Sequence, residues 1–348
     1  MKLNWISYYP NYDGYGRFSS RLVLALLNAG IDIKVATMEH RDMPDWMLRH
    51  EGLSWDDLSI SMMPPYFVKE IPGRQWLFTM TEGSRIPEDW VFKINNSRLE
   101  RVIVPCEHNK IAFEESGVLP PVYVVNGGVD PDEFLMRPGY TRFRYSEKRG
   151  RVGESPYTFL TLADRGFRKG WEEVWTAFYK AFGGKTTGHK DVRLIIKYRS
   201  NTTADFMARG GNLDPRVVYQ KDDSMDMYQV YSQADCAVMP SRSEGWGMPH
   251  RECASMGIPT IIQNYSGMAE GAWSWGFVAE NGAMRPIPKE NKVALGEWMV
   301  ADTDEIAEMM ERCYNNSVHF YEFGLNRALW LQQNQTWTES AVALREML

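Results

Sequence analysis

Several features that would define a class of protein are scarce or missing in this chain of 348 residues. Its cysteines are widely spaced and form no Cys-x-x-Cys pair; they are Cys106, Cys236, Cys253 and Cys313. This spacing excludes the common thiolate metal sites and disfavours a disulfide framework. No apolar run approaches the roughly 20 residues that a membrane-spanning helix needs, and the start MKLNWISYYP lacks the apolar region of a signal peptide. We therefore expect reduced thiols in a cytoplasmic protein without an integral membrane segment.

The chain also lacks an excess of positive charge. Lys and Arg number 39 against 45 Asp and Glu, a net charge of −6, which disfavours general nucleic-acid binding. No G-x-G-x-x-G follows the first apolar strand with an acidic residue about 20 positions later, and this disfavours a nicotinamide dehydrogenase. Aromatic residues are plentiful, with 13 Trp and 17 Tyr. The length indicates two domains rather than one.

Short apolar runs alternate with segments of helical periodicity, which favours α/β domains with parallel sheets. The pattern predicts strands at 2–7, 31–37, 76–80, 101–104, 122–125, 158–162, 193–197, 217–219, 235–239 and 260–262. A loop with Gly14 and Gly16 separates the first strand from a helix whose apolar positions begin at Phe18. Asp302 and Glu305 resemble a capping box that starts another helix. Two further helical segments, 320–333 and 337–348, close the chain.

The alternation breaks at 137–156, a segment rich in Arg, Gly and Pro without apolar periodicity. We therefore predict a first Rossmann-like domain at 1–150 and a second at 151–320, followed by C-terminal helices at 321–348. Two such halves bind a ligand between the carboxyl ends of their sheets. The basic stretch 137–151 also carries aromatic residues, so it is either a solvated loop or a loop that binds an acceptor or nucleic acid.

The most informative segment is PSRSEGWGMPHRE, in which Glu244 and Glu252 lie eight residues apart. It follows an apolar strand, and its glycine-rich turn leads to Pro249, a favoured first residue of a helix. The free amides of such a turn and the positive end of the helix dipole attract phosphate. A carboxylate on each side can accept hydrogen bonds from hydroxyl groups. This mixture predicts a site for a sugar nucleotide.

The residues SRSEGWGMPHRECASMGIPTI resemble the signature of retaining glycosyltransferases of family four, the glycosyl transferases group 1. Three other segments resemble family segments and occur in the same order along the chain, namely FTMTEG, VYVVNGGVDPDEF and FLTLADRGFRKGW. TWTESAVALREML is similar to the helix that crosses back to the first domain. The resemblance implies the GT-B fold, in which two Rossmann-like domains with parallel sheets face each other across a cleft.

The resemblance also implies roles for individual residues. Glu252 would accept hydrogen bonds from the ribose of the donor. Glu244 would hold the transferred sugar together with the turn that follows it, namely Gly245, Trp246, Gly247 and Met248. Lys169 would neutralise the diphosphate as the sugar leaves. The amides of Gly14 and Gly16 would approach the same phosphates.

Some positions depart from the family or stay open. Arg165 is the expected partner of Lys169, but it lies four residues before the lysine rather than five or six, so Arg168 competes for that role. Glu82 is a candidate contact for acceptor or donor, or a structural carboxylate. Trp246 is either a sugar platform or a packing residue. His108 and His250 are interpreted as local hydrogen-bonding residues.

The reaction implied is transfer of a hexose from a nucleotide sugar to a hydroxyl acceptor with retention, in which the leaving phosphate helps to take the acceptor proton. No carboxylate then needs to act as a nucleophile. UDP-glucose is the preferred donor and GDP-mannose its rival. No metal or other cofactor is expected, because the resemblance implies an enzyme that works without a bound metal, and nothing in the sequence looks like an Asp-x-Asp metal site beside a strand end.

The acceptor could be a glycan, a lipid-linked sugar or a small molecule. A hydroxymethylated base in DNA is an alternative, motivated by the basic stretch and testable by gel-shift binding at low and high salt. A catalytically silent GT-B domain that serves as a binding or scaffold protein is a further alternative.

Overall fold

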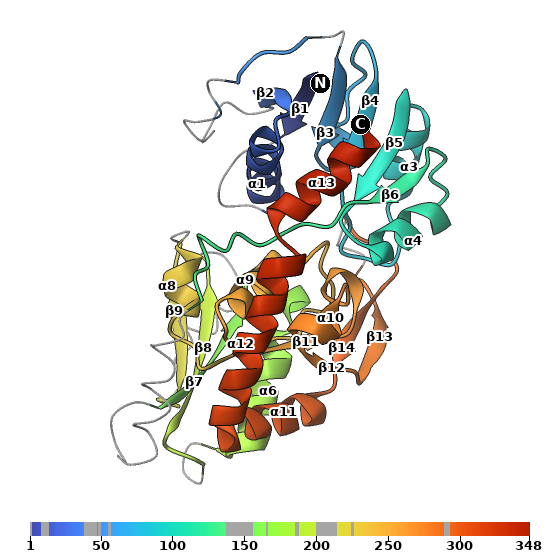
Figure 1. Ribbon diagram of the computed structural model, residues 1–348. Coiled ribbons are helices and arrows are strands. Elements are labelled where there is room, and N and C mark those ends of the chain that lie inside the picture. The colour runs from blue at the N-terminus through green and yellow to red at the C-terminus, as the bar shows by residue number, and fades with distance from the viewer. Residues whose placement is uncertain are drawn as a thin grey trace.

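The computed structural model describes residues 2–7, 14–37, 47, 50–54, 57–136, 156–164, 166–184, 188–199, 214–223, 226–288 and 293–348. Figure 1 shows two α/β domains, one above the other, with the chain ends both in the upper domain. Each domain contains a six-stranded sheet in which all paired strands are parallel. The predicted α/β architecture with two parallel sheets is therefore confirmed.

The first sheet has the strand order β2-β1-β3-β4-β5-β6. The elements of this domain are β1 (Lys2–Ser7), α1 (Gly14–Asn28), β2 (Asp32–Thr37), β3 (Leu58–Met62), the 3-10 helix η1 (Pro65–Phe67), β4 (Gln75–Phe78), α3 (Glu88–Asn95), β5 (Leu99–Val104), α4 (Glu107–Glu115) and β6 (Val122–Val124). Apolar side chains of α1, such as Phe18, Leu22 and Leu26, are fully buried against this sheet, as their helical spacing predicts.

The second sheet has the order β12-β11-β10-β7-β8-β9. Its domain contains β7 (Tyr157–Leu162), η2 (Gly166–Lys169), α6 (Trp171–Phe182), β8 (Val192–Tyr198), β9 (Val217–Lys221), α8 (Met227–Tyr231), β10 (Cys236–Met239), α9 (Met248–Ser255), β11 (Thr260–Gln263), η3 (Ser266–Met268), α10 (Ala272–Trp275), β12 (Phe277–Ala279), β13 (Gly282–Pro286), β14 (Glu297–Ala301) and α11 (Thr303–Asn315). The strands β13 and β14 form a separate antiparallel pair.

The strand orders determine where a ligand can bind. In the second sheet β7 and β10 are neighbours. The chain continues from β7 to β8, toward one edge of the sheet, and from β10 to β11, toward the other edge. Parallel sheets bind ligands at such a switch point, beyond the carboxyl ends of the strands. The segments after β7 and β10 are 163–170 and 240–247, so the sheet brings the Arg168–Lys169 pair next to the Glu244 turn.

Four strands were not predicted from the sequence, and β3 shows why. Its sequence LSISM is fully buried, although it alternates apolar residues with serine. The serines are satisfied by neighbouring strands, since Asn4 donates to Ser59 Oγ at 3.1 Å and Gln75 donates to Ser61 Oγ at 3.3 Å. The strands β12, β13 and β14 have only three to five residues each, which is too short for a clear periodic pattern.

The start of α11 corrects one detail of the prediction. Asp302 does cap the helix and accepts hydrogen bonds from the amides of Asp304 and Glu305. The Glu305 carboxylate does not return to Asp302, because it accepts from the amides of Glu280 and Asn281 instead. Tertiary contacts thus replace the second half of the predicted capping box.

Two segments cross between the domains side by side. The stretch after β6 runs down to the second domain, and α12 (Ser317–Asn334) leads up to α13 (Trp337–Met347), which packs on α1 (Figure 1). Val129 donates to the carbonyl of Gln335 at 2.8 Å where these segments meet. The predicted return of the C-terminal helix is therefore confirmed. The exact domain boundaries stay predictions, and residues 137–151 lie outside the described residues.

No helix in the described part of the chain is long and apolar enough to cross a membrane.

The crossing point predicts a strong effect of a small substitution. Gly128 has room for hydrogen only, because a Cβ there would overlap the backbone of Thr336 and Trp337. We expect Gly128→Ala to force the crossing segments apart and to destabilise the protein by about 1–3 kcal/mol. Gly184→Ala is the control, since a Cβ at Gly184 meets nothing within 4 Å. Thermal unfolding followed by circular dichroism should show a lower midpoint only for Gly128→Ala, and equal midpoints would contradict this account.

Candidate active site

A cavity of about 520 Å³ lies between the two domains. Its walls come from the segments that follow the carboxyl ends of β1, β3 and β4 in the first domain, and of β7, β8 and β10 in the second. It contains most of the residues predicted for the site, including Gly14, Glu82, Lys169, Glu244 and Glu252. The cavity therefore brings together positions from both halves of the chain.

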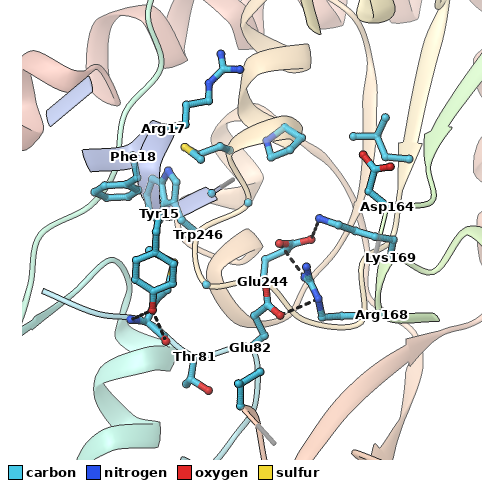
Figure 2. Close-up of a pocket in the computed structure, with 18 of the residues that line it drawn as sticks. Tyr15, Arg17, Phe18, Thr81, Glu82, Asp164, Arg168, Lys169, Glu244 and Trp246 are labelled. Carbon is cyan, nitrogen blue, oxygen red and sulfur yellow. Dashed lines mark hydrogen bonds and ion pairs between the residues drawn. The ribbon is translucent and has the colours of Figure 1, made fainter. Parts of the chain in front are cut away.

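Glu244 is the centre of a buried charge cluster (Figure 2). Lys169 donates to Glu244 Oε1 at 2.6 Å, and Arg168 Nη1 lies 2.9 Å from Glu244 Oε2. Arg168 Nε also lies 2.9 Å from Glu82 Oε2, which belongs to the first domain. Arg168 thus bridges two carboxylates from opposite sides of the cleft. The structure favours Arg168 for a place in the site, and Arg165 lies outside the described residues.

The protonation states follow from this cluster. Burial raises the pKa of Glu244, but the charges of Arg168 and Lys169 outweigh it and hold the pKa well below its usual range. Burial lowers the pKa of Lys169, and the Glu244 charge offsets only part of that effect. Glu244 is therefore a firmly ionised carboxylate. Such a group accepts hydrogen bonds from hydroxyls but is a poor base.

Glu252, on α9, lies at a different end of the cavity and has other partners. The Tyr231 hydroxyl donates to Glu252 Oε2 at 3.0 Å, and Arg17 Nη2 from α1 lies 3.2 Å from Glu252 Oε1. Arg17 also pairs with Glu133 at 2.8 Å and lies over the ring of Phe134. Burial raises the pKa of Glu252, and the Arg17 charge acts against that shift. Sequence reasoning missed Arg17, which was visible only as a polar position on the first turn of α1.

The turn between Glu244 and α9 is held by contacts on both sides. Arg251 donates to the carbonyls of Trp246 and Gly267, and its guanidinium stacks 3.7 Å from the centre of the Trp246 ring. No described residue accepts a hydrogen bond from the amides of Gly245, Trp246 or Gly247. These amides and the start of α9 at Met248 thus keep the geometry of an anion cradle.

The side chain of Trp246 packs in the first domain's core rather than standing free in the cavity. It is 2% exposed and belongs to the same apolar cluster as Phe18 and Trp337. A Cβ at Gly127 would come within 2.8 Å of both rings. The packing alternative for this indole therefore fits the structure, and donor contact by its backbone amide stays a prediction.

The glycines at the start of α1 differ from the expected loop. The helix begins at Gly14, so Gly14 and Gly16 lie in its first turn rather than before it. Gly14 is exposed on the cavity wall, whereas Gly16 is buried. Amides of a helix start are as suitable for phosphate as those of a loop. The role predicted for these two glycines is untested.

A second group that sequence reasoning missed lies at the ends of β7 and β8. Asp164 accepts a hydrogen bond from the fully buried Lys197 at 3.0 Å, and Arg199 lies 3.7 Å away. Asp164 and Arg199 line the cavity, where Figure 2 shows the Asp164 carboxylate near Lys169. Asp164 and Arg199 each follow a predicted strand, and this position was the feature of the sequence that could have indicated a place in the site.

The two histidines considered from sequence make local hydrogen bonds. His108 Nε2 lies 3.2 Å from the carbonyl of Gly83, and His250 Nε2 lies 3.2 Å from Ser241 Oγ. Burial of His250 is the main reason that its pKa falls to about 3. His250 is therefore neutral at physiological pH, although it lies close to Glu244.

One Asp-x-Asp sequence follows a strand that was not predicted, because Asp302 and Asp304 come directly after β14. Asp302 caps α11, and Asp304 pairs with Lys180 at 2.6 Å. Both line a hollow that is separate from the cleft. Among the described residues, no group of three or more His, Cys, Asp or Glu side chains could hold a metal ion. Metal independence remains a prediction.

Comparison with known proteins adds a sequence match to this geometry. The model of the glycosyl transferases group 1 covers the segment from before β7 to the end of β13. Residues 147–286 match this family. The resemblance inferred from the Glu244 segment is confirmed at that level, while the retaining subtype is untested. Comparison with curated protein sequences gives no match.

Solved structures show that the chain has the GT-B fold over its whole length. HepE from Anabaena, in complex with UDP and glucose, has a TM-score of 0.67 at 11% identity and covers 100% of this chain and 99% of its own. Sucrose-phosphate synthase from Thermosynechococcus elongatus has a TM-score of 0.66 at 14% identity, with coverages of 99% and 98%. The Escherichia coli trehalose-6-phosphate structure bound with UDP-2-fluoro glucose has a TM-score of 0.67 at 11% identity, with coverages of 100% and 98%.

The state of His250 predicts how this GT-B protein responds to acid. An unfolded histidine titrates near pH 6.5, so between pH 6.5 and 3 the unfolded chain binds a proton that the folded chain does not. Above pH 6.5 His250 therefore does not reduce the free energy of unfolding. On acidification this residue lowers the free energy of unfolding, by about 2 kcal/mol at pH 5. We expect His250→Gln to lose less stability than the parent between pH 7 and pH 5 in denaturant titrations.

The exposed His319, converted to Gln, is the matched control and should behave like the parent. An equal loss of stability on acidification in the parent and in His250→Gln would show that His250 does not carry the effect.

Proposed function

We propose that this protein transfers a hexose from a nucleotide sugar, preferably UDP-glucose, to a hydroxyl acceptor with retention of configuration. The observation that carries the proposal is the cluster of Glu244, Lys169 and Arg168 at the switch point of the second sheet. A buried ion cluster costs desolvation energy and adds little to stability by itself. A substrate that uses these charges explains why they are gathered in the cleft.

The donor would lie along the cavity from Glu252 to Glu244. The ribose hydroxyls would donate to Glu252, which then exchanges part of its contact with Arg17 for the ligand. The diphosphate would meet Lys169 and the amides at the start of α1 and α9, since both helix dipoles favour negative charge there. The hexose hydroxyls would donate to Glu244.

The electrostatics of Glu244 support a reaction without a carboxylate base. A carboxylate whose pKa is held far below its usual range by two cations is a poor acceptor of the proton of an attacking hydroxyl. Glu82 is likewise paired with Arg168, so we assign the proton of the attacking hydroxyl to the leaving phosphate. Attack from the face of the leaving group would then give retention, with Lys169 and Arg168 stabilising the charge that develops on the phosphate.

The preference for UDP-glucose rests on the fold together with the sequence match. HepE is described in complex with UDP-glucose, and the Escherichia coli structure is bound with UDP-2-fluoro glucose. GDP-mannose stays the rival donor. The scaffold alternative leaves the assembled ion cluster without a use. The DNA alternative depended on residues 137–151, which lie outside the described residues, so no observation favours it.

Two carboxylate variants test the proposed orientation of the donor. Glu252→Ala should mainly weaken UDP binding, because a hydrogen bond to a charged group is worth about 1.5–3 kcal/mol. Glu244→Ala should depress turnover more than UDP affinity, because its partners act at the bond that breaks. Calorimetric titration with UDP and the rate of UDP release from UDP-glucose measure the two effects.

Glu114→Ala removes an exposed carboxylate of α4 outside the cleft and should match the parent in both measurements. If Glu244→Ala and Glu252→Ala also matched the parent, the assignment of the donor site would be wrong.

A further inference from the structure

We infer that the acceptor is a neutral saccharide whose ring lies against Tyr66 on the first-domain wall of the cleft. This inference rests on the proposed function and concerns the half of the cleft that the donor does not fill. It names the chemical class of the acceptor, which neither the Glu244 segment nor the comparisons indicate.

The wall is formed where the chain leaves β3. In the first sheet β3 lies between β1 and β4, so its carboxyl end opens between the start of α1 and the segment that carries Glu82. The chain there forms the short helix η1, and Pro64, Tyr66 and Phe67 line the cavity with Trp90 of α3. These residues face the same space as Glu82.

The ring of Tyr66 is exposed to the cavity but packs against two other aromatic side chains. Its side chain is 46% exposed, although it is large and partly apolar. Its ring centre lies 4.1 Å from that of Phe67 and 6.0 Å from that of Trp90, which is only 3% exposed. An aromatic face held in place on a buried base and open to a cavity offers a flat ligand a large contact area at little entropic cost. The C–H face of a pyranose fits such a surface.

The second domain adds an apolar residue to the lining of the cavity. Val293, which is 44% exposed, belongs to the connection between β13 and β14 and also lines the cavity. That connection is tied to the first domain, since Arg85 and Leu295 exchange two backbone hydrogen bonds of 3.1 Å. Glu297 also donates its amide to Ser84 Oγ at 2.9 Å. The aromatic wall and Val293 are thus held in one cavity across the domain boundary.

The charges argue for a neutral and hydroxyl-rich acceptor. Among the described first-domain residues that line the cavity, the charged side chains are Arg17 and Glu82. Arg17 is engaged with Glu133 and Glu252 at the other end, while Glu82 carries a negative charge beside the reacting cluster. A phosphate on the acceptor would meet the Glu82 carboxylate here, while the partner cation Arg168 is already engaged with Glu82 and Glu244. Hydroxyl groups would instead donate to it, which favours a sugar over a phosphorylated sugar or an aromatic alcohol.

The test uses the full-length protein with UDP-glucose and measures UDP release with and without acceptor probes. The probes are methyl glucosides and neutral disaccharides, glucose 6-phosphate, and benzyl alcohol. We expect the neutral sugars to stimulate UDP release above the rate of donor hydrolysis. Tyr66→Ala should raise the KM for the stimulating sugar roughly 5- to 10-fold, because an aromatic contact of this kind is lost.

Two further variants separate the role of the ring from a change in folding. Tyr66→Phe keeps the aromatic face and should retain most of the sugar affinity. Phe92→Ala removes an aromatic residue of α3 that is 69% exposed and does not line the cavity, so it should behave like the parent. UDP affinity, measured alongside, shows whether any variant has a defect at the donor site instead.

Stimulation by glucose 6-phosphate or benzyl alcohol alone, or by no probe while UDP-glucose is hydrolysed, would overturn the inference about the acceptor and leave the proposed donor chemistry standing. An unchanged KM in Tyr66→Ala would overturn the position of the ring. No hydrolysis of UDP-glucose and no binding of UDP would count against the proposed function itself and remove both.

Discussion

The structure depends on the way the charge of Glu244 is buried. A carboxylate in a low-dielectric interior is costly unless cations and hydrogen bonds compensate it. Arg168 and Lys169 provide two cations from consecutive positions at the end of η2. They can reach Glu244 only because β7 and β10 are neighbours in the sheet. Since Arg168 also binds Glu82, the same compensation joins the two domains.

A second contact between the domains is apolar. Trp246, two residues beyond Glu244, inserts into the first domain's core beside Phe18, and Arg251 fixes the turn from the other side. The position of Glu244 is therefore set by packing on one side and by ion pairs on the other. This arrangement holds the turn rigidly, which a site needs if its amides are to meet a phosphate without reorganisation.

The cleft has two chemically different parts. Toward the second domain it is rich in charge, with Lys169, Arg199, Asp164 and the two signature glutamates. Toward the first domain it is aromatic around Tyr66, with Glu82 at the boundary. The proposed transfer requires an anionic donor and a hydroxyl acceptor held within a few ångströms of each other. The division of charge across the cleft suits that proposal.

The sequence alone predicted the α/β class, most strands and the GT-B resemblance, because apolar periodicity and a glycine-rich turn are local properties of the chain. It also predicted that Glu244, Glu252 and Lys169 belong to one site, and the structure places all three in the same cavity. Local patterns did not reveal β3, whose serines are satisfied by other strands, nor Arg17, whose partner Glu252 lies on the other domain. They also left open what surrounds Arg168 and Trp246. Only the tertiary structure shows the ion pairs of Arg168 and the packing of the Trp246 ring, since an ion pair or a packed ring depends on which residues the fold brings within a few ångströms of each other.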